Sequence, residues 1–157
     1  MDDIRVLLFF YFGEAVLLFY TGLAMFELKL SIPRLLCTAG LYSLCIWFVR
    51  GLYAMYNIPL GTHTLILVVL SILLMKFIGK VNWIFSVGAV LTGFSLILIG
   101  NWFINLIIQQ INLTWEHILS SVWLHILFGY LEDTFLILLL ILNKIFGLSY
   151  IKLFELE

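Results

Sequence analysis

Residues 9–20 read FFYFGEAVLLFY, an apolar run that a single carboxylate, Glu14, interrupts. The run belongs to a longer stretch, residues 4–26, and a transmembrane helix needs about 20 predominantly apolar residues. The whole chain has the same character, because 64% of its 157 residues are hydrophobic and only 11% are charged. Soluble domains carry about 25% charged residues. The sequence therefore predicts an integral membrane protein.

The expected fold class is all-α, a polytopic helix bundle that forms one domain over residues 1–157. Polar residues, glycine and the two prolines, Pro33 and Pro59, separate the apolar stretches and are expected in the connections. The acidic start of the chain and the lack of a small-residue cleavage site indicate that the first stretch is retained as a helix. Five transmembrane helices are predicted, at residues 4–26, 35–53, 62–78, 82–108 and 126–146.

A sixth, shorter helix is predicted at the membrane surface. The segment INLTWEHILSSVWLHI, residues 111–126, places apolar side chains at helical spacing on one face and polar ones on the other. This pattern is typical of an interfacial helix, here over residues 114–125, with Thr114 as its N-cap. The alternative is that the segment extends the last membrane helix.

Small residues predict how the helices pack. Ala89 and Gly93 form a small-xxx-small pair in the fourth predicted span, and such pairs let helix backbones approach closely. Residues 82–108 are therefore expected to form the central, tightly packed helix.

The distribution of Lys and Arg predicts the orientation. Six of the eight lie on the side reached by the ends of the first, third and fifth spans: Lys29, Arg34, Lys76, Lys80, Lys144 and Lys152. Only Arg5 and Arg50 lie on the other side. Because cytoplasmic loops carry the excess of basic residues, the N-terminus is expected outside a bacterial cytoplasmic membrane and the C-terminus in the cytoplasm.

This topology collects the polar residues within the membrane into its outer half. At about 1.5 Å per residue they lie roughly 5 to 15 Å below the outer surface, and two histidines border the same region. The predicted ligand-binding residues are Glu14, Arg50, His63, Asn101, His125, Glu132 and Asp133.

A charged side chain inside the membrane is costly and needs a partner or a polar environment, and these residues can therefore be interpreted in three ways. Arg50 is expected to pair with Glu14, Glu132 or Asp133, so three acids share one base. The first interpretation is a structural ion pair with no further role. The second is a ligand cavity open to the outside, and the third is a proton or ion path.

Catalysis, a cofactor or a metal site is not expected. The chain contains no phosphate-binding glycine loop, GxSxG elbow or HExxH pair. Cys37 and Cys45 are expected in the inner part of the second span, whereas His63, His117 and His125 are expected outside, so they cannot form a catalytic pair.

Three segments carry a family resemblance. They are ELKLSIPRLL (residues 27–36), VRGLYAMYNIPLGTHTLILVVLSILL (residues 49–74) and WEHILSSVWLHILFGYL (residues 115–131). Together they resemble the N-terminal membrane region of Firmicutes sensor histidine kinases of the accessory-gene-regulator, GHKL-ATPase type. The resemblance implies that the helices receive an extracellular cue, often a peptide, and signal to a cytoplasmic kinase. The chain itself ends at Glu157 without a phospho-accepting helix or an ATP-binding domain, so kinase activity is not expected of it.

The leading hypothesis is therefore a non-enzymatic sensor domain with an outward-facing polar cavity. Membrane lipid, an extracellular peptide or small molecule, and a membrane protein or a second copy of the chain are the expected partners, and nucleic acid is not. A small proton- or cation-coupled transporter is the first alternative, with Glu14 as the exchanging carboxylate. Against it, the sequence shows no inverted repeat and no discontinuous helix. The second alternative is an assembly subunit of a larger membrane complex.

Overall fold

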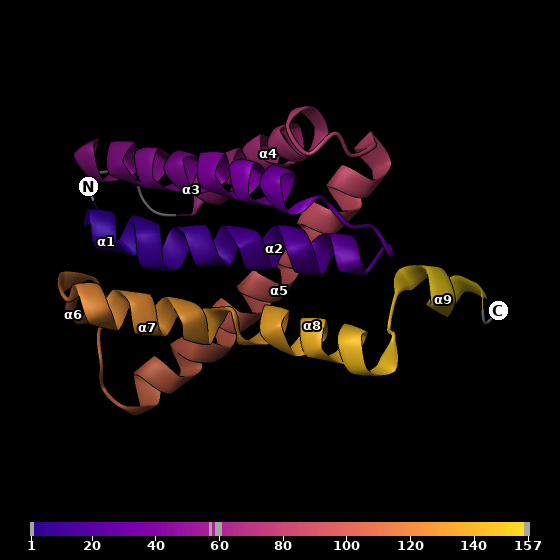
Figure 1. Cartoon of the computed structure of the whole chain (residues 1–157). Helices are drawn as coiled ribbons and strands as arrows, with labels where there is room; N and C mark the ends of the chain where they lie inside the picture. Colours follow the sequence, from indigo (N-terminus) through magenta and orange to yellow (C-terminus); the bar gives the residue numbers. More distant parts are fainter. Residues whose placement is uncertain (1, 57, 59–60, 156–157) are drawn as a thin grey trace.

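The computed structural model describes residues 2–56, 58 and 61–155, and every regular element within these ranges is helical (Figure 1). The all-α prediction is confirmed. In chain order the elements are α1 (Ile4–Val6), the π-helix η1 (Leu7–Tyr11), α2 (Phe12–Ala24), α3 (Ile32–Met55), α4 (Thr62–Phe77), α5 (Trp83–Gln110), α6 (Trp115–Ser120), α7 (Val122–Glu132), α8 (Thr134–Phe146) and α9 (Tyr150–Glu155).

Among the described residues, three helices are long and apolar enough to cross a membrane. They are Ile4–Ala24, Ile32–Met55 and Trp83–Gln110, and the pair α7 and α8, bent by 44°, makes a fourth if it is one span. α4 is apolar but has only 16 residues, which extend about 24 Å at 1.5 Å per residue. The hydrocarbon core is about 30 Å thick. The five predicted segments are thus all helical, but α4 falls short of a full span.

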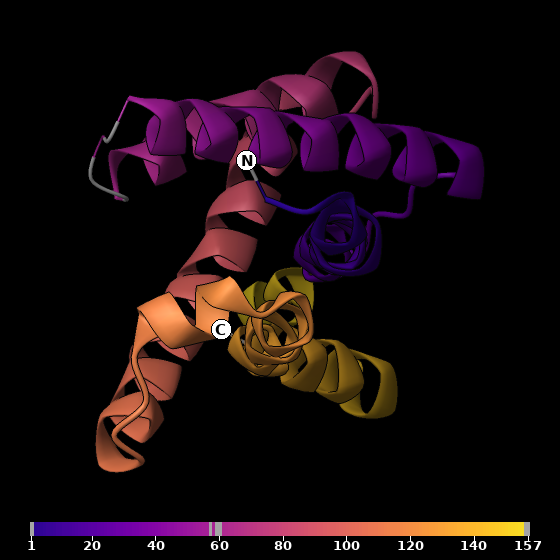
Figure 2. The same cartoon turned by 90° about the vertical axis from the view of Figure 1, so that its left-hand side faces the viewer.

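The first membrane helix, and not α5, is the most enclosed. Over the most apolar 18 residues of each helix, 56% of this window is buried within the protein in the first helix, compared with 33% in α5. Figure 2 shows α1 and α2 nearly end-on, with α3 on one side and α8 on the other, while α5 crosses obliquely. The prediction that residues 82–108 form the central helix therefore does not hold for burial, although α5 packs against α2, α4, α7 and α8. Several small residues of α5 make close contacts, and Ala89 is one that meets α2. At that contact a Cβ on Gly22 of α2 would collide with the carbonyl oxygen of Ala89.

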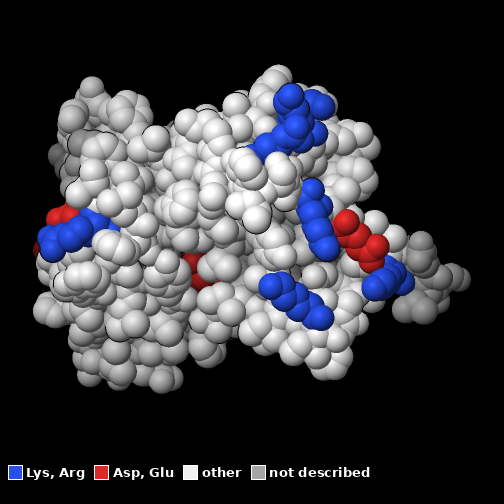
Figure 3. All heavy atoms as spheres, viewed as in Figure 1, with Lys and Arg blue, Asp and Glu red and all other residues white. Residues whose placement is uncertain are grey.

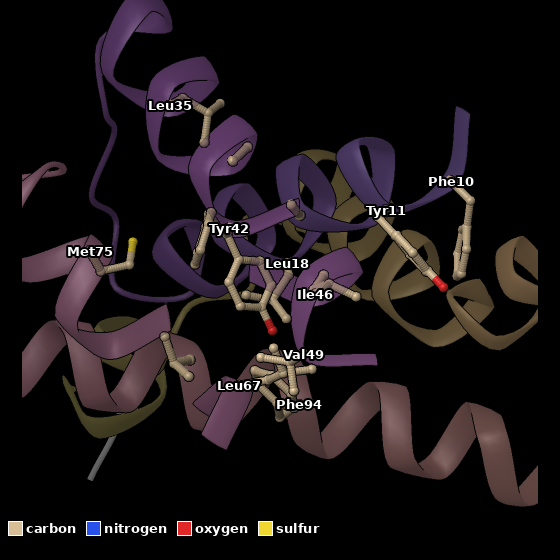
Figure 4. Packing of buried hydrophobic residues seen from close by; sticks show 14 of the residues in the cluster. Phe10, Tyr11, Leu18, Leu35, Tyr42, Ile46, Val49, Leu67, Met75 and Phe94 are labelled. Carbon is tan, nitrogen blue, oxygen red and sulfur yellow. The ribbon is translucent and has the colours of Figure 1, made fainter. Parts of the chain in front are cut away.

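The main hydrophobic core lies where α2, α3, α4 and α5 meet (Figure 4). Phe19 and Tyr42 pack with their ring centroids 5.3 Å apart, and Leu18, Met75 and Val90 are fully buried around them. Burial on this scale excludes lipid from the interhelical space and fixes the helix positions that surround the cavity described below.

The cations are separated by end of the molecule. Figure 3 shows most Lys and Arg atoms at the end where α9 lies in Figure 1, and a smaller group at the N-terminal end. This separation agrees with the count of six against two along the sequence. Which end faces the cytoplasm remains a prediction.

Two predicted boundaries differ from the structure. Pro33 lies in the first turn of α3, where its missing N–H costs nothing because first-turn N–H groups have no intrahelical partner. Pro59 lies outside the described residues. The interfacial helix is shorter than the predicted residues 114–125. Thr114 caps α6 by accepting from the backbone N–H of His117 at 3.3 Å, but the extended backbone of Ser121 ends α6 and begins α7.

Asp3, the N-cap of α1, makes the stability of the fold depend slightly on pH in the acidic range. The Asp3 carboxylate accepts from the Arg5 guanidinium at 2.9 Å and from the Arg5 backbone N–H at 2.8 Å. These bonds lower the pKa of Asp3 from 3.8 to about 2. A lowered native pKa stabilises the folded state above pH 3.8, and that contribution is lost as the pH falls through about 2.

Asp3→Asn is therefore expected to reduce the acid-induced loss of stability between about pH 4 and pH 2. Thermal melting of the detergent-solubilised protein across this range measures it. Asp3→Asn melting in parallel with the unmodified protein from pH 5 to pH 2 would contradict the assignment.

Candidate functional site

A cavity of about 570 Å³ lies between α2, α3, α4, α5, α6 and α7, toward the N-terminal end of the bundle. Six of the seven residues predicted for the site line it, although they come from five different helices. These six are Glu14, Arg50, His63, Asn101, His125 and Glu132. Asp133 is the exception and lies behind the wall. The fold therefore brings together residues that are up to 118 positions apart in the sequence, from Glu14 to Glu132.

The remainder of the lining is mainly aromatic and aliphatic. Phe10, Tyr42, Phe94 and Trp115 contribute rings, and Ile46, Leu67, Ile97, Leu98 and Leu119 contribute aliphatic surface. A pocket with a few polar groups in an apolar wall is the usual form of a small-molecule site.

Arg50 does not pair with the acids predicted for it. Its Nε lies 3.3 Å from an Asp2 carboxylate oxygen, and its guanidinium lies 5.4 Å from the centre of the Tyr11 ring. Among the described residues, no salt bridge within 4.0 Å involves Glu14, Glu132 or Asp133. The predicted pairing was wrong because the N-terminal segment folds back and places a nearer carboxylate beside Arg50.

Asp2 attaches this N-terminal segment to the bundle. Its carboxylate accepts from the Tyr11 hydroxyl, and its backbone carbonyl accepts from the Trp47 indole at 2.8 Å. In the sequence Asp2 stands out only as part of an acidic start. A local pattern could not have found this role, since the partners are 9 and 45 residues away.

A chain of hydrogen bonds runs along the wall formed by α5. Asn101 donates to Glu132 at 3.3 Å, and Asn105 donates to the Asn101 side-chain oxygen at 2.7 Å. Trp115 then donates its indole N–H to Asn105 at 2.6 Å. The chain connects the acid on α7 to the first residue of α6. Asn105 was not predicted, although its spacing of four from Asn101 places both on one helix face.

The break between α7 and α8 lies at this wall. Asp133 sits between the two helices with 1% of its surface exposed, and neither carboxylate oxygen has a hydrogen-bond partner among the described residues. At the preceding residue, a Cβ on Gly100 would collide with the carbonyl oxygen of Glu132. The backbones of α5 and α7 are therefore in direct contact where the helix bends.

The π-helix η1 immediately precedes the turn that carries Glu14. Inside it the Phe9 carbonyl accepts from the Tyr130 hydroxyl, and the Phe10 ring lies 6.1 Å from that of His125. π-Helical turns occur frequently at functional sites. This one joins the first helix to α7 beside the cavity, which Phe10 lines.

The start of α4 lines one side of the cavity. His63 accepts from the Gly61 backbone N–H at 3.0 Å, and its ring lies 5.7 Å from that of Tyr53 on α3. Thr62 and Tyr53 share a hydrogen bond of 2.9 Å. These contacts hold the short helix against α3 beside the cavity.

The fold and the site together define the class: an all-α protein with three to four candidate membrane spans, which indicates a multi-pass membrane protein, and a polar cavity among its helices. Comparisons with known protein families, curated proteins and solved structures find no match for this chain.

Proposed function

We propose that the chain is a non-enzymatic sensor domain of the bacterial cytoplasmic membrane, with its cavity facing outward and its C-terminus in the cytoplasm. The observation that carries the proposal is the convergence of six polar residues on one cavity of about 570 Å³. Polar residues inside a membrane are expensive and normally face a cavity or a partner. The resemblance to sensor-kinase membrane regions supports the same function, with a separate kinase or membrane protein as the output.

The charges favour a ligand that carries a positive group. Glu14 and Glu132 line the cavity without a salt-bridge partner among the described residues, whereas Arg50 is already paired with Asp2. Nearby rings, including Tyr42 and Trp115, provide faces that attract cations. An organic amine or a peptide with a free amino terminus fits this combination.

A physical connection runs from the cavity to the far end of the protein. α2 carries Glu14 at one end, and at the other end the Ala24 and Met25 carbonyls accept from Asn143 at 3.2 Å and from the Tyr150 backbone N–H at 2.7 Å. Ser149 also donates to Glu27 at 2.7 Å. A ligand that favours one placement of α2 over another would move α9 with it, as differential affinity for two states requires.

Cysteine labelling tests the cavity and its orientation. Thr64 lines the cavity, so Thr64→Cys, in a Cys37→Ser/Cys45→Ser background, is expected to react in right-side-out vesicles with a membrane-impermeant methanethiosulfonate. The cationic reagent should react at least about tenfold faster than the anionic one, because acidic clefts concentrate cations. Spermidine or a synthetic peptide with a free amino terminus should slow the reaction, and Glu132→Gln should remove that protection.

Val69→Cys provides the matched control, because Val69 lies on the same helix, does not line the cavity and has 55% of its surface exposed. It is expected to stay unlabelled. Equal labelling at both positions would contradict the cavity, and labelling only in inverted vesicles would contradict the orientation. A labelled Thr64→Cys with no difference between cationic and anionic reagents would remove the argument for a cationic ligand.

The structure also favours one alternative, a proton- or cation-coupled transporter. The 44° bend between α7 and α8 is a discontinuous helix. No sequence pattern indicates this break, and the expected lack of such a helix was an argument against transport. Broken helices near the membrane midplane often form ion sites in transporters. Proton uptake into proteoliposomes that is abolished by Glu14→Gln would favour this function over sensing.

A further inference from the structure

A second cavity, of about 330 Å³, lies at the opposite end of the bundle from the first. It is formed by the connection between α2 and α3 and by the turn between α4 and α5. Three cations line it, Lys29, Arg34 and Lys80, and no acid does. Leu28, Leu30 and Phe85 contribute apolar surface to its lining.

The three cations differ from the others at this end of the molecule. Lys152 lies 3.7 Å from a Glu27 oxygen, Lys76 lies 5.6 Å from the Trp83 ring and Lys144 lies 5.6 Å from the Tyr20 ring. Among the described residues, Lys29, Arg34 and Lys80 make no salt bridge or ring contact of this kind. Their charges are therefore available to an anion.

The backbone places Lys80 at the cavity. Gly79 donates to the Leu74 carbonyl and Val81 to the Met75 carbonyl, each at 3.1 Å, which closes the end of α4. Lys80 adopts a left-handed backbone with φ 57°. This conformation is unfavourable for a residue with a side chain, and the two flanking hydrogen bonds stabilise it.

Two helix starts add to the positive potential. α3 begins at Ile32 with Arg34 in its first turn, and α5 begins at Trp83 after Asn82. Neither N-cap side chain accepts a first-turn N–H, so these donors lack a side-chain acceptor. The N-terminal ends of helices carry partial positive charge and bind phosphate readily.

We propose that this cavity binds a phosphate-bearing anion, and specifically the headgroup of an anionic phospholipid. The cations and the two helix starts would receive the phosphate, while Leu28, Leu30 and Phe85 provide an apolar surface for the start of the acyl chains. Basic pockets between membrane helices bind such headgroups. The proposal is independent of what the cavity around Glu14 binds.

Native mass spectrometry of the detergent-solubilised protein tests the site. Titration with phosphatidylglycerol and with phosphatidylcholine is expected to show a clear preference for the anionic lipid. Arg34→Gln/Lys80→Gln should weaken phosphatidylglycerol binding roughly thirtyfold, because each basic residue near an anionic surface contributes about a factor of five. Lys76→Gln/Lys144→Gln removes the same charge from the same end outside the cavity and should bind phosphatidylglycerol nearly as well as the unmodified chain.

Equal losses in the two double variants would overturn the proposal, since they would reflect general surface charge. Equal binding of the two lipids by the unmodified protein would also overturn it, and that comparison needs no variant. Inorganic phosphate distinguishes the sources of the anion. Failure of 10 mM phosphate to displace phosphatidylglycerol supports the lipid, whereas displacement at micromolar phosphate would reassign the cavity to a soluble anion.

Discussion

Gly100→Ala is expected to lower the free energy of unfolding by about 3 kcal/mol. The added Cβ would collide with the carbonyl oxygen of Glu132, which belongs to the backbone of α7 and cannot rotate away. Separation of α5 from α7 would also lengthen the hydrogen bond between Asn101 and Glu132 and widen the cavity that both residues line. Thermal and denaturant unfolding in a mild detergent measures the effect.

Gly40→Ala is the matched control for this substitution. Gly40 lies inside α3, and the nearest atom to an added Cβ is a Phe12 ring carbon at 3.8 Å, an ordinary contact. Because alanine is a better helix former than glycine, Gly40→Ala should be neutral or stabilising by up to about 1 kcal/mol. If both variants unfold together, α5 and α7 do not touch at Gly100.

Asp133→Ala is expected to raise the free energy of unfolding by about 2 kcal/mol. Both carboxylate oxygens of Asp133 are buried without a hydrogen-bond partner among the described residues, and removal of an unsatisfied polar group relieves its desolvation penalty. Alanine also favours helix where α7 meets α8. The same unfolding measurements apply, with Glu116→Ala as the control, since Glu116 is an exposed acid on α6 and its loss should change stability by less than about 0.5 kcal/mol.

The result also bears on function. A stabilised Asp133→Ala protein that has lost its response to ligand would show that the buried acid is kept for activity at a cost in stability. Strong destabilisation would contradict the interpretation of Asp133 as an unsatisfied group. It would indicate that the carboxyl has a partner inside the membrane, such as a bound cation, and would favour the transporter function over the sensor function.

The helical class and the positions of the main apolar helices follow from local sequence. In a membrane, a long run of apolar residues can satisfy its backbone hydrogen bonds within one segment only as a helix. Composition and run length were therefore sufficient to predict α2, α3 and α5. The candidate site was also largely predictable, because Glu14, Asn101 and Glu132 stand out as polar residues in apolar runs. Two of the failures arose where a helix breaks. Nothing around Ser121 or Asp133 resembles the proline or glycine signals that usually mark a helix end.

By itself, the sequence determined which segments are helices, which residues are too polar to face lipid, and how the cations divide between the two ends. Only the tertiary structure decided that Arg50 pairs with Asp2, that the first helix is the most enclosed, that Asp133 lies at a bend behind the wall, and that Lys29, Arg34 and Lys80 border one cavity. The physical reason is the distance along the chain between the residues that interact. Helix formation and membrane partition depend on neighbours within a few turns, whereas ion pairs and cavities depend on contacts between helices far apart in the chain.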